Sequence, residues 1–110
     1  MKYRTTNKDI KNGYSKVLKV GYCGLQSLLS CTQPTAYTCG IYGWNADIYD
    51  FGDIAICTGY RPIGTSVDYD LCDYYEKKAQ QINEARLSWD ERKGNLEHLL
   101  AMFIKEATEN

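Results

Sequence analysis

The 110-residue sequence has a single histidine, His98, and none of its five cysteines is spaced as C-x-x-C. Structural zinc sites use closely spaced Cys and His ligands, so a Cys/His metal centre is not expected. A Cys–His nucleophilic pair would need the histidine beside a thiol, but His98 lies among Leu96, Leu99 and Leu100, at the boundary of an apolar helix stripe. The residues therefore predict no metal, no cofactor and no enzymatic activity.

Several common motifs are missing as well. The sequence contains no G-x-G-x-x-G, Walker or G-x-S-x-G motif, and Asp50-Phe51-Gly52 lacks the companion motifs of a protein kinase. No run approaches the roughly 18 apolar residues of a membrane span, and the first residues lack the apolar region of a signal peptide. Because the odd number of cysteines shows no disulfide pattern, we expect reduced thiols, a cytoplasmic location and no membrane contact.

The net charge of −1 disfavours direct binding to a nucleic-acid backbone. Residues 1–20 nevertheless hold six basic residues and one acidic residue, whereas residues 21–76 hold one basic and seven acidic residues. The acidic set could mimic a phosphate backbone or hold a divalent cation; it comprises Asp47, Asp50, Asp53, Asp68, Asp70 and Asp73. It has no EF-hand spacing, and aspartate is ordinary at turns and helix starts, which favours a solvated acidic face.

The length fits a single domain spanning 1–110, with a polar arm at 1–13, a β-rich part at 14–64 and a helical tail at 66–107. The pattern predicts strands over 14–20, 36–44, 45–51 and 54–60, with turns near 44–47 and 51–53. Val17 and Val20 are the core candidates of the first strand. Between the first two strands, Leu25, Leu28 and Leu29 have helical spacing, which predicts a short helix over 23–30.

The tail shows the period of a helix. One stripe comprises Val67, Leu71, Tyr75, Ile82, Ala85 and Trp89, and a second comprises Leu96, Leu99, Leu100 and Phe103. Ser88 and Glu91 fit a capping box, which favours two helices over one long helix, and Thr65, Ser66 and Asp68 are candidate N-caps. We therefore predict an α+β fold: a small antiparallel β-α-β-β-β sheet covered by one or two C-terminal helices. The apolar stripe exceeds what a small sheet needs, so these helices could also form a homo-oligomer contact.

The stretch GIYGWNADIYDFGD, residues 40–53, holds four aromatic rings, three carboxylates and three glycines. Such residues suit a β-hairpin, and they also suit a recognition surface because Tyr and Trp give rigid contact area. The hairpin is the favoured interpretation, and it can also present a surface. The candidate binding residues are Tyr42, Trp44, Asn45, Asp47, Tyr49, Tyr60 and Arg61. Arg61 would either grip an anionic group or pair with a neighbouring aspartate.

Three segments carry a resemblance: VGYCGLQSLL (20–29), AYTCGIYGWNADIYDF (36–51) and IAICTGYRPIG (54–64). Their pattern, GYC-x-LQ-x-LL, YGWN-x-D-x-Y and TGY-x-P-x-G, resembles small proteins of Gram-positive gut bacteria and their phage-like and conjugative elements. The resemblance covers Gly21 to Gly64. It implies an accessory role, such as tuning a host protein, and no catalytic residue.

The leading hypothesis is a non-enzymatic protein-interaction module that binds another protein through Tyr42–Asp50 and Tyr60–Gly64. One alternative is an acidic inhibitor that mimics nucleic acid and occupies a host nucleic-acid-binding protein. Another is a small-ligand or nucleotide-binding domain built from the hairpin, Tyr60 and Arg61.

Overall fold

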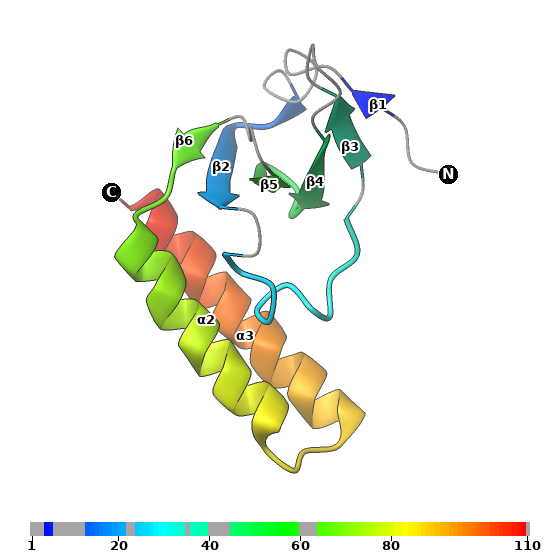
Figure 1. The fold of residues 1–110 in the computed structure, drawn as a ribbon, viewed down its shortest axis with the longest axis vertical. Coiled ribbons are helices and arrows are strands. Elements are labelled where there is room, and N and C mark those ends of the chain that lie inside the picture. The colour runs from blue at the N-terminus through cyan, green and yellow to red at the C-terminus, as the bar shows by residue number, and fades with distance from the viewer. Residues whose placement is uncertain are drawn as a thin grey trace. The chain divides into compact units, whose positions relative to one another are not determined.

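The computed structural model describes residues 4–5, 13–21, 24–34, 36–39, 45–59 and 64–109. These residues contain both strands and helices, which confirms the α+β class (Figure 1). The strands are β1 (Arg4–Thr5), β2 (Lys16–Gly21), β3 (Ala36–Cys39), β4 (Asn45–Asp50), β5 (Ile54–Gly59) and β6 (Thr65–Ser66). The helices are α2 (Tyr69–Glu84) and α3 (Trp89–Thr108).

The chain forms two compact units, a sheet unit and a helical unit. The sheet unit comprises 1–23 and 33–67, and the helical unit comprises 24–32 and 68–110. The segment 24–32, which lies between two strands in the sequence, thus belongs with the helices. The predictions of one domain, and of helices that cover the sheet, stay predictions.

The sheet is mixed, and the prediction of a purely antiparallel sheet was wrong. Its order is β1-β3-β4-β5-β2-β6, in which β1 and β6 have two residues each. The predicted meander β3-β4-β5 is antiparallel, whereas β2 pairs in parallel with β5 over six residues. The parallel pair arises because the chain leaves the sheet after β2 and returns only at β3, so β2 cannot form a hairpin with the next strand.

The centre of the sheet is apolar on both faces. Val17, Ala55, Cys57 and Ile48 form one buried cluster, with Tyr14 packed against it. Leu18, Val20 and Ile56 alternate with these residues and are also buried. The sequence predicted Val17 and Val20 as core residues but not Leu18. A parallel strand that is buried on both faces has core residues at consecutive positions, and this is why Leu18, next to Val17, was left out of the predicted core.

One predicted turn is confirmed and the other is wrong. The β4–β5 turn lies at Phe51–Asp53, where Gly52 has φ +87° and donates its N–H to Asp50 Oδ1 at 2.9 Å. The turn predicted at 44–47 is contradicted, because Asn45, Ala46 and Asp47 lie in β4. All three residues pair with β3, and Ala46 and Asp47 also pair with β5, so strand pairing outweighs the turn preference of Asn and Asp.

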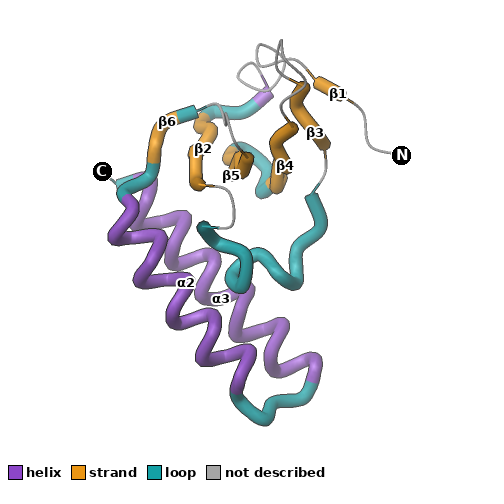
Figure 2. The backbone as a smooth tube through the Cα atoms, viewed as in Figure 1, coloured by secondary structure: helices purple, strands orange, loops and turns teal. Residues whose placement is uncertain are grey.

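The predicted short helix over 23–30 was also wrong for the residues described. Residues 24–34 form a series of turns, drawn as loop in Figure 2. Leu29 N–H donates to the Leu25 carbonyl, whereas the N–H groups of Ser30 and Thr32 donate to the carbonyls three residues earlier, those of Ser27 and Leu29. So short a segment cannot offset the cost of helix nucleation. The three leucines, Leu25, Leu28 and Leu29, are nevertheless buried.

Two helices, rather than one, form the tail, as predicted. Ser88 and Glu91 make the expected capping box at the start of α3. Ala85 has an extended conformation (ψ 151°), which ends α2 and interrupts the predicted first stripe. The buried residues of α2 are accordingly Cys72, Tyr75 and Ala79.

The predictions at the two ends of that first stripe were wrong in part. Trp89 is 62% exposed, because it begins a new helix instead of continuing α2. Thr65 and Ser66 lie in β6, whereas Asp68 occupies the N-cap position of α2, as predicted, although its side chain makes no cap bond. The second stripe is confirmed, since Leu96, Leu99, Leu100 and Phe103 are all buried.

Candidate binding surface on the helical hairpin

The predicted site residues divide into those that the structure describes and those that it does not. Tyr42, Trp44, Tyr60 and Arg61 lie outside the described residues. Asn45 is the first residue of β4, and Asp47 and Tyr49 follow in the same strand, both half-buried. Alternation along a strand places Asp47 and Tyr49 on one face of the sheet, opposite Ile48.

The predicted acidic set divides between the two units. Asp47, Asp50 and Asp53 belong to the sheet unit, and Asp68, Asp70 and Asp73 to the helical unit. Two of them have a local structural partner. Asp50 accepts the Gly52 N–H in the turn, and Asp73 pairs with Lys77 at 3.0 Å on exposed helix surface. Such contacts are usual for aspartates in tight turns and on exposed helix surfaces.

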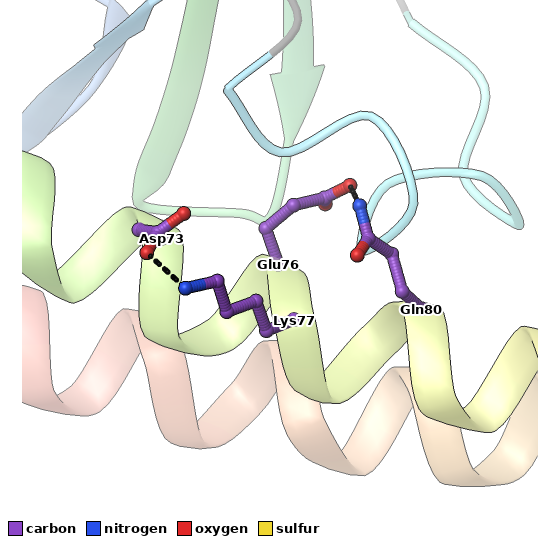
Figure 3. A network of polar contacts seen from close by, with 4 residues as sticks. All are labelled: Asp73, Glu76, Lys77 and Gln80. Carbon is purple, nitrogen blue, oxygen red and sulfur yellow. Dashed lines mark hydrogen bonds and ion pairs between the residues drawn. The ribbon is translucent and has the colours of Figure 1, made fainter.

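A carboxylate organises the helical unit. Glu76 Oε1 accepts the backbone N–H groups of Ser27 at 2.9 Å and Leu28 at 3.2 Å, and Oε2 accepts Ser27 N–H at 3.1 Å. Gln80 Nε2 donates to Oε2 at 3.3 Å (Figure 3). Glu76 therefore holds the segment 24–32 against one side of the helical hairpin. Its carboxylate accepts two backbone N–H groups that have no acceptor within a helix.

Aromatic rings pack inside the same unit. Tyr75 and Phe103 meet edge to face, with ring centroids 5.4 Å apart, and join α2 to α3. Burial and the nearby Glu106 carboxylate raise the pKa of Tyr75, with a further contribution from Tyr74. The ring centroids of Tyr74 and Tyr75 lie 5.2 Å apart, and the Tyr74 side chain is 53% exposed. The ring cluster thus extends from the core to the surface.

A hollow of about 400 Å³ lies between the helices. It is lined by Lys78, Gln81 and Ile82 of α2, by Ala85 at the C-cap of α2, by Leu87 of the connection, and by Asn95 and Leu99 of α3. Tyr74 precedes Lys78 by four residues, and Met102 follows Leu99 by three, so both extend the lined faces. Met102 is 47% exposed.

These residues define the open side of the hairpin, represented by Tyr74, Lys78, Ile82, Leu99 and Met102. Glu76 lies two residues before Lys78, about 200° around the helix at about 100° per residue, so the segment 24–32 occupies the opposite side. Sequence reasoning missed the open side. The stripes predicted the buried faces, but only the pairing of α2 with α3 shows which flanking residues line a hollow.

A second hollow, of about 490 Å³, lies in the sheet unit. It is lined by Tyr14, Ser15, Lys16, Val17, Gly64 and Thr65. Asp47 and Tyr49, the candidates with described side chains, do not line it. The small-ligand alternative therefore gains no specific support from these two residues.

The described thiols are suited to packing. Cys31, Cys57 and Cys72 are free, and burial raises the pKa of Cys57 and of Cys72 to about 11, Asp68 adding to the effect at Cys72. Both thiols stay protonated at neutral pH, so neither is an activated nucleophile. No cluster of three or more metal-ligating side chains occurs within the described residues, and no helix there is long and apolar enough to cross a bilayer.

No family model, curated protein or solved structure matches this chain. Its function is therefore inferred from its own residues.

Proposed function

We propose that this protein is a non-enzymatic protein-binding module, and that the open side of its helical hairpin contacts the partner. The observation that carries the proposal is the exposure of Tyr74 and Met102, which lie on the same helix faces as Lys78 and Leu99 of the hollow. Tyrosine and methionine are enriched in protein interfaces, and tyrosine provides a large contact area at small entropic cost. While they are exposed to water, these side chains lack the hydrophobic stabilisation that burial against a partner would provide.

The protonated thiols of Cys57 and Cys72 support the non-enzymatic part of the proposal. The free thiols also fit a reducing compartment, so we place the protein in the cytoplasm. The resemblance of residues 21–64 to proteins of phage-like and conjugative elements supports an accessory role directed at a host protein. The predicted residues around Tyr42–Asp50 and Tyr60–Gly64 remain a second candidate contact region.

Site-specific photo-crosslinking in living cells tests the proposal. A photoreactive phenylalanine analogue replaces Tyr74 or Met102 in turn, and the matched control position is Glu97, which is exposed on α3. Glu97 lies about 160° around the helix from Leu99, away from the hollow. We expect a discrete crosslinked protein from positions 74 and 102 and a much weaker one from position 97. Equal products from all three positions, or none, would contradict the proposal.

A further inference from the structure

The open side also has the properties of a groove for one class of partner. Building on the proposed function, we infer that it binds an amphipathic α-helix of another protein, whose apolar side chains enter the hollow and whose carboxylate meets Lys78. A hollow of about 400 Å³ lies within the size range of sites that bury several apolar groups. Helices that dock in grooves present such groups at i, i+3 or i+4, and i+7.

The backbone chemistry of the groove favours a helix over an extended segment. The walls are the helices α2 and α3, whose interior backbone groups bond within each helix. The polar side chains of the lining are Lys78, Gln81 and Asn95. An extended occupant would bury N–H and C=O groups with few partners, whereas a helix satisfies its own backbone and packs into the furrow between two others.

The charge of the groove points to an acidic occupant. Lys78 is the charged residue of the lining, and its ammonium lies 4.9 Å from the centre of the exposed Tyr74 ring. Arg92 lies one turn before Asn95 on α3, but it does not line the hollow and its Nε is buried. Lys78 is thus the cation that the hollow presents, and a carboxylate on the occupant would supply its countercharge.

The same cation argues against a second copy of this chain as the occupant. A two-fold contact uses the same surface of both copies, so it would bring two Lys78 side chains to one patch. The residues that line the hollow include no carboxylate to offset them. Like charges brought together at an interface oppose association, and a foreign acidic helix avoids this repulsion.

A display library of helical peptides tests the inference on the full-length protein. The peptides carry apolar residues at i, i+4 and i+7, and their flanking positions vary among Asp, Glu, Gln and Lys. We expect selection of peptides with Asp or Glu at one flanking position. Their Kd should rise about tenfold with Lys78→Glu, and a peptide with Lys at that position should recover part of the lost affinity.

The matched control is Lys77→Glu, which makes the same change of charge one residue away on exposed helix surface. It should leave the peptide Kd within about twofold, because position 77 points about 100° away from position 78. Circular dichroism and thermal unfolding report whether each variant keeps its fold. NMR shifts on titration should centre on the methyl groups of Ile82, Leu99 and Met102.

Three results would overturn the inference. One is the recovery of peptides without acidic preference, or of none. Another is equal binding to the wild type and Lys78→Glu. The third is a dimer in sedimentation analysis whose dissociation constant changes with Lys78→Glu or Ala85→Glu. Such a dimer would show that a second copy occupies the groove. If crosslinks still form at Tyr74 while acidic helices fail to bind, the proposed function survives and this inference fails.

Discussion

Replacing Glu76 by alanine tests how the segment 24–32 is held in the helical unit. The carboxylate is half-buried and receives the amides of Ser27 and Leu28, at distances between 2.9 and 3.2 Å. Alanine removes both acceptor oxygens. It is also at least as good a helix former as glutamate, so a loss of stability cannot be attributed to the propensity of α2.

The expected loss follows from the number of amides involved. A hydrogen bond to a charged group contributes about 1.5–3 kcal/mol, and water replaces part of that value at a half-buried site. For two amides we expect Glu76→Ala to lower the free energy of unfolding by about 2–3 kcal/mol and the Tm by roughly 10 °C. Glu76→Gln keeps Oε1, which accepts both amides, and should cost about 1 kcal/mol.

Urea denaturation measures the stability, and hydrogen exchange by NMR locates the effect. The Ser27 and Leu28 amides should exchange faster in Glu76→Ala, because they lose their acceptors. The matched control is Gln80→Ala, which removes only the 3.3 Å bond on the exposed surface and should cost less than about 0.5 kcal/mol. The reasoning is refuted if Glu76→Ala is as stable as the control and the two amides exchange as in the wild type.

Three further predictions concern the backbone, the thiols and the helix cap. Gly64 has φ +113°, and a Cβ there would clash with the Val17 carbonyl oxygen, so Gly64→Ala should cost about 2–4 kcal/mol in urea denaturation. Gly94→Ala, on open helix surface, should instead stabilise by about 0.5–1 kcal/mol. The pKa of Cys57 and of Cys72 is raised from 9.0 to about 11, so the unfolded thiols lose protons first. The stability that they confer is therefore full below pH 9 and lost as the pH rises to 11, by up to about 3 kcal/mol per thiol, and a variant with both changed to alanine should show a shallower decline. Ser88→Ala removes the capping-box acceptor and should lower the Tm by an amount equivalent to about 1 kcal/mol in a thermal melt.

Local patterns predicted the elements whose hydrogen bonds close within a few residues. The capping box at Ser88 and Glu91 and the tight turn at Gly52 were both correct. The stripe Leu96 to Phe103 was correct for the same reason, since the period of a helix fixes which residues share a face. Gly64 had no such local signal, because its close contact with Val17 joins distant parts of the chain.

The candidate site was predicted less well. Asp47 and Tyr49 lie together on β4, as strand alternation required, but four of the seven residues lie outside the described part of the chain. The open side of the hairpin was not anticipated. Its lining combines residues from α2, the connection and α3, and their pairing depends on how Tyr75 meets Phe103.

The sequence by itself determined the α+β composition, the meander of three antiparallel strands and the division of the tail into two helices, because hydrogen bonding and side-chain period act over short distances along the chain. Only the tertiary structure decided that β2 runs parallel to β5, that Glu76 receives the amides of Ser27 and Leu28, and that a hollow opens between α2 and α3. Each of these depends on contacts between residues far apart in sequence, where burial and the satisfaction of backbone groups outweigh local preference.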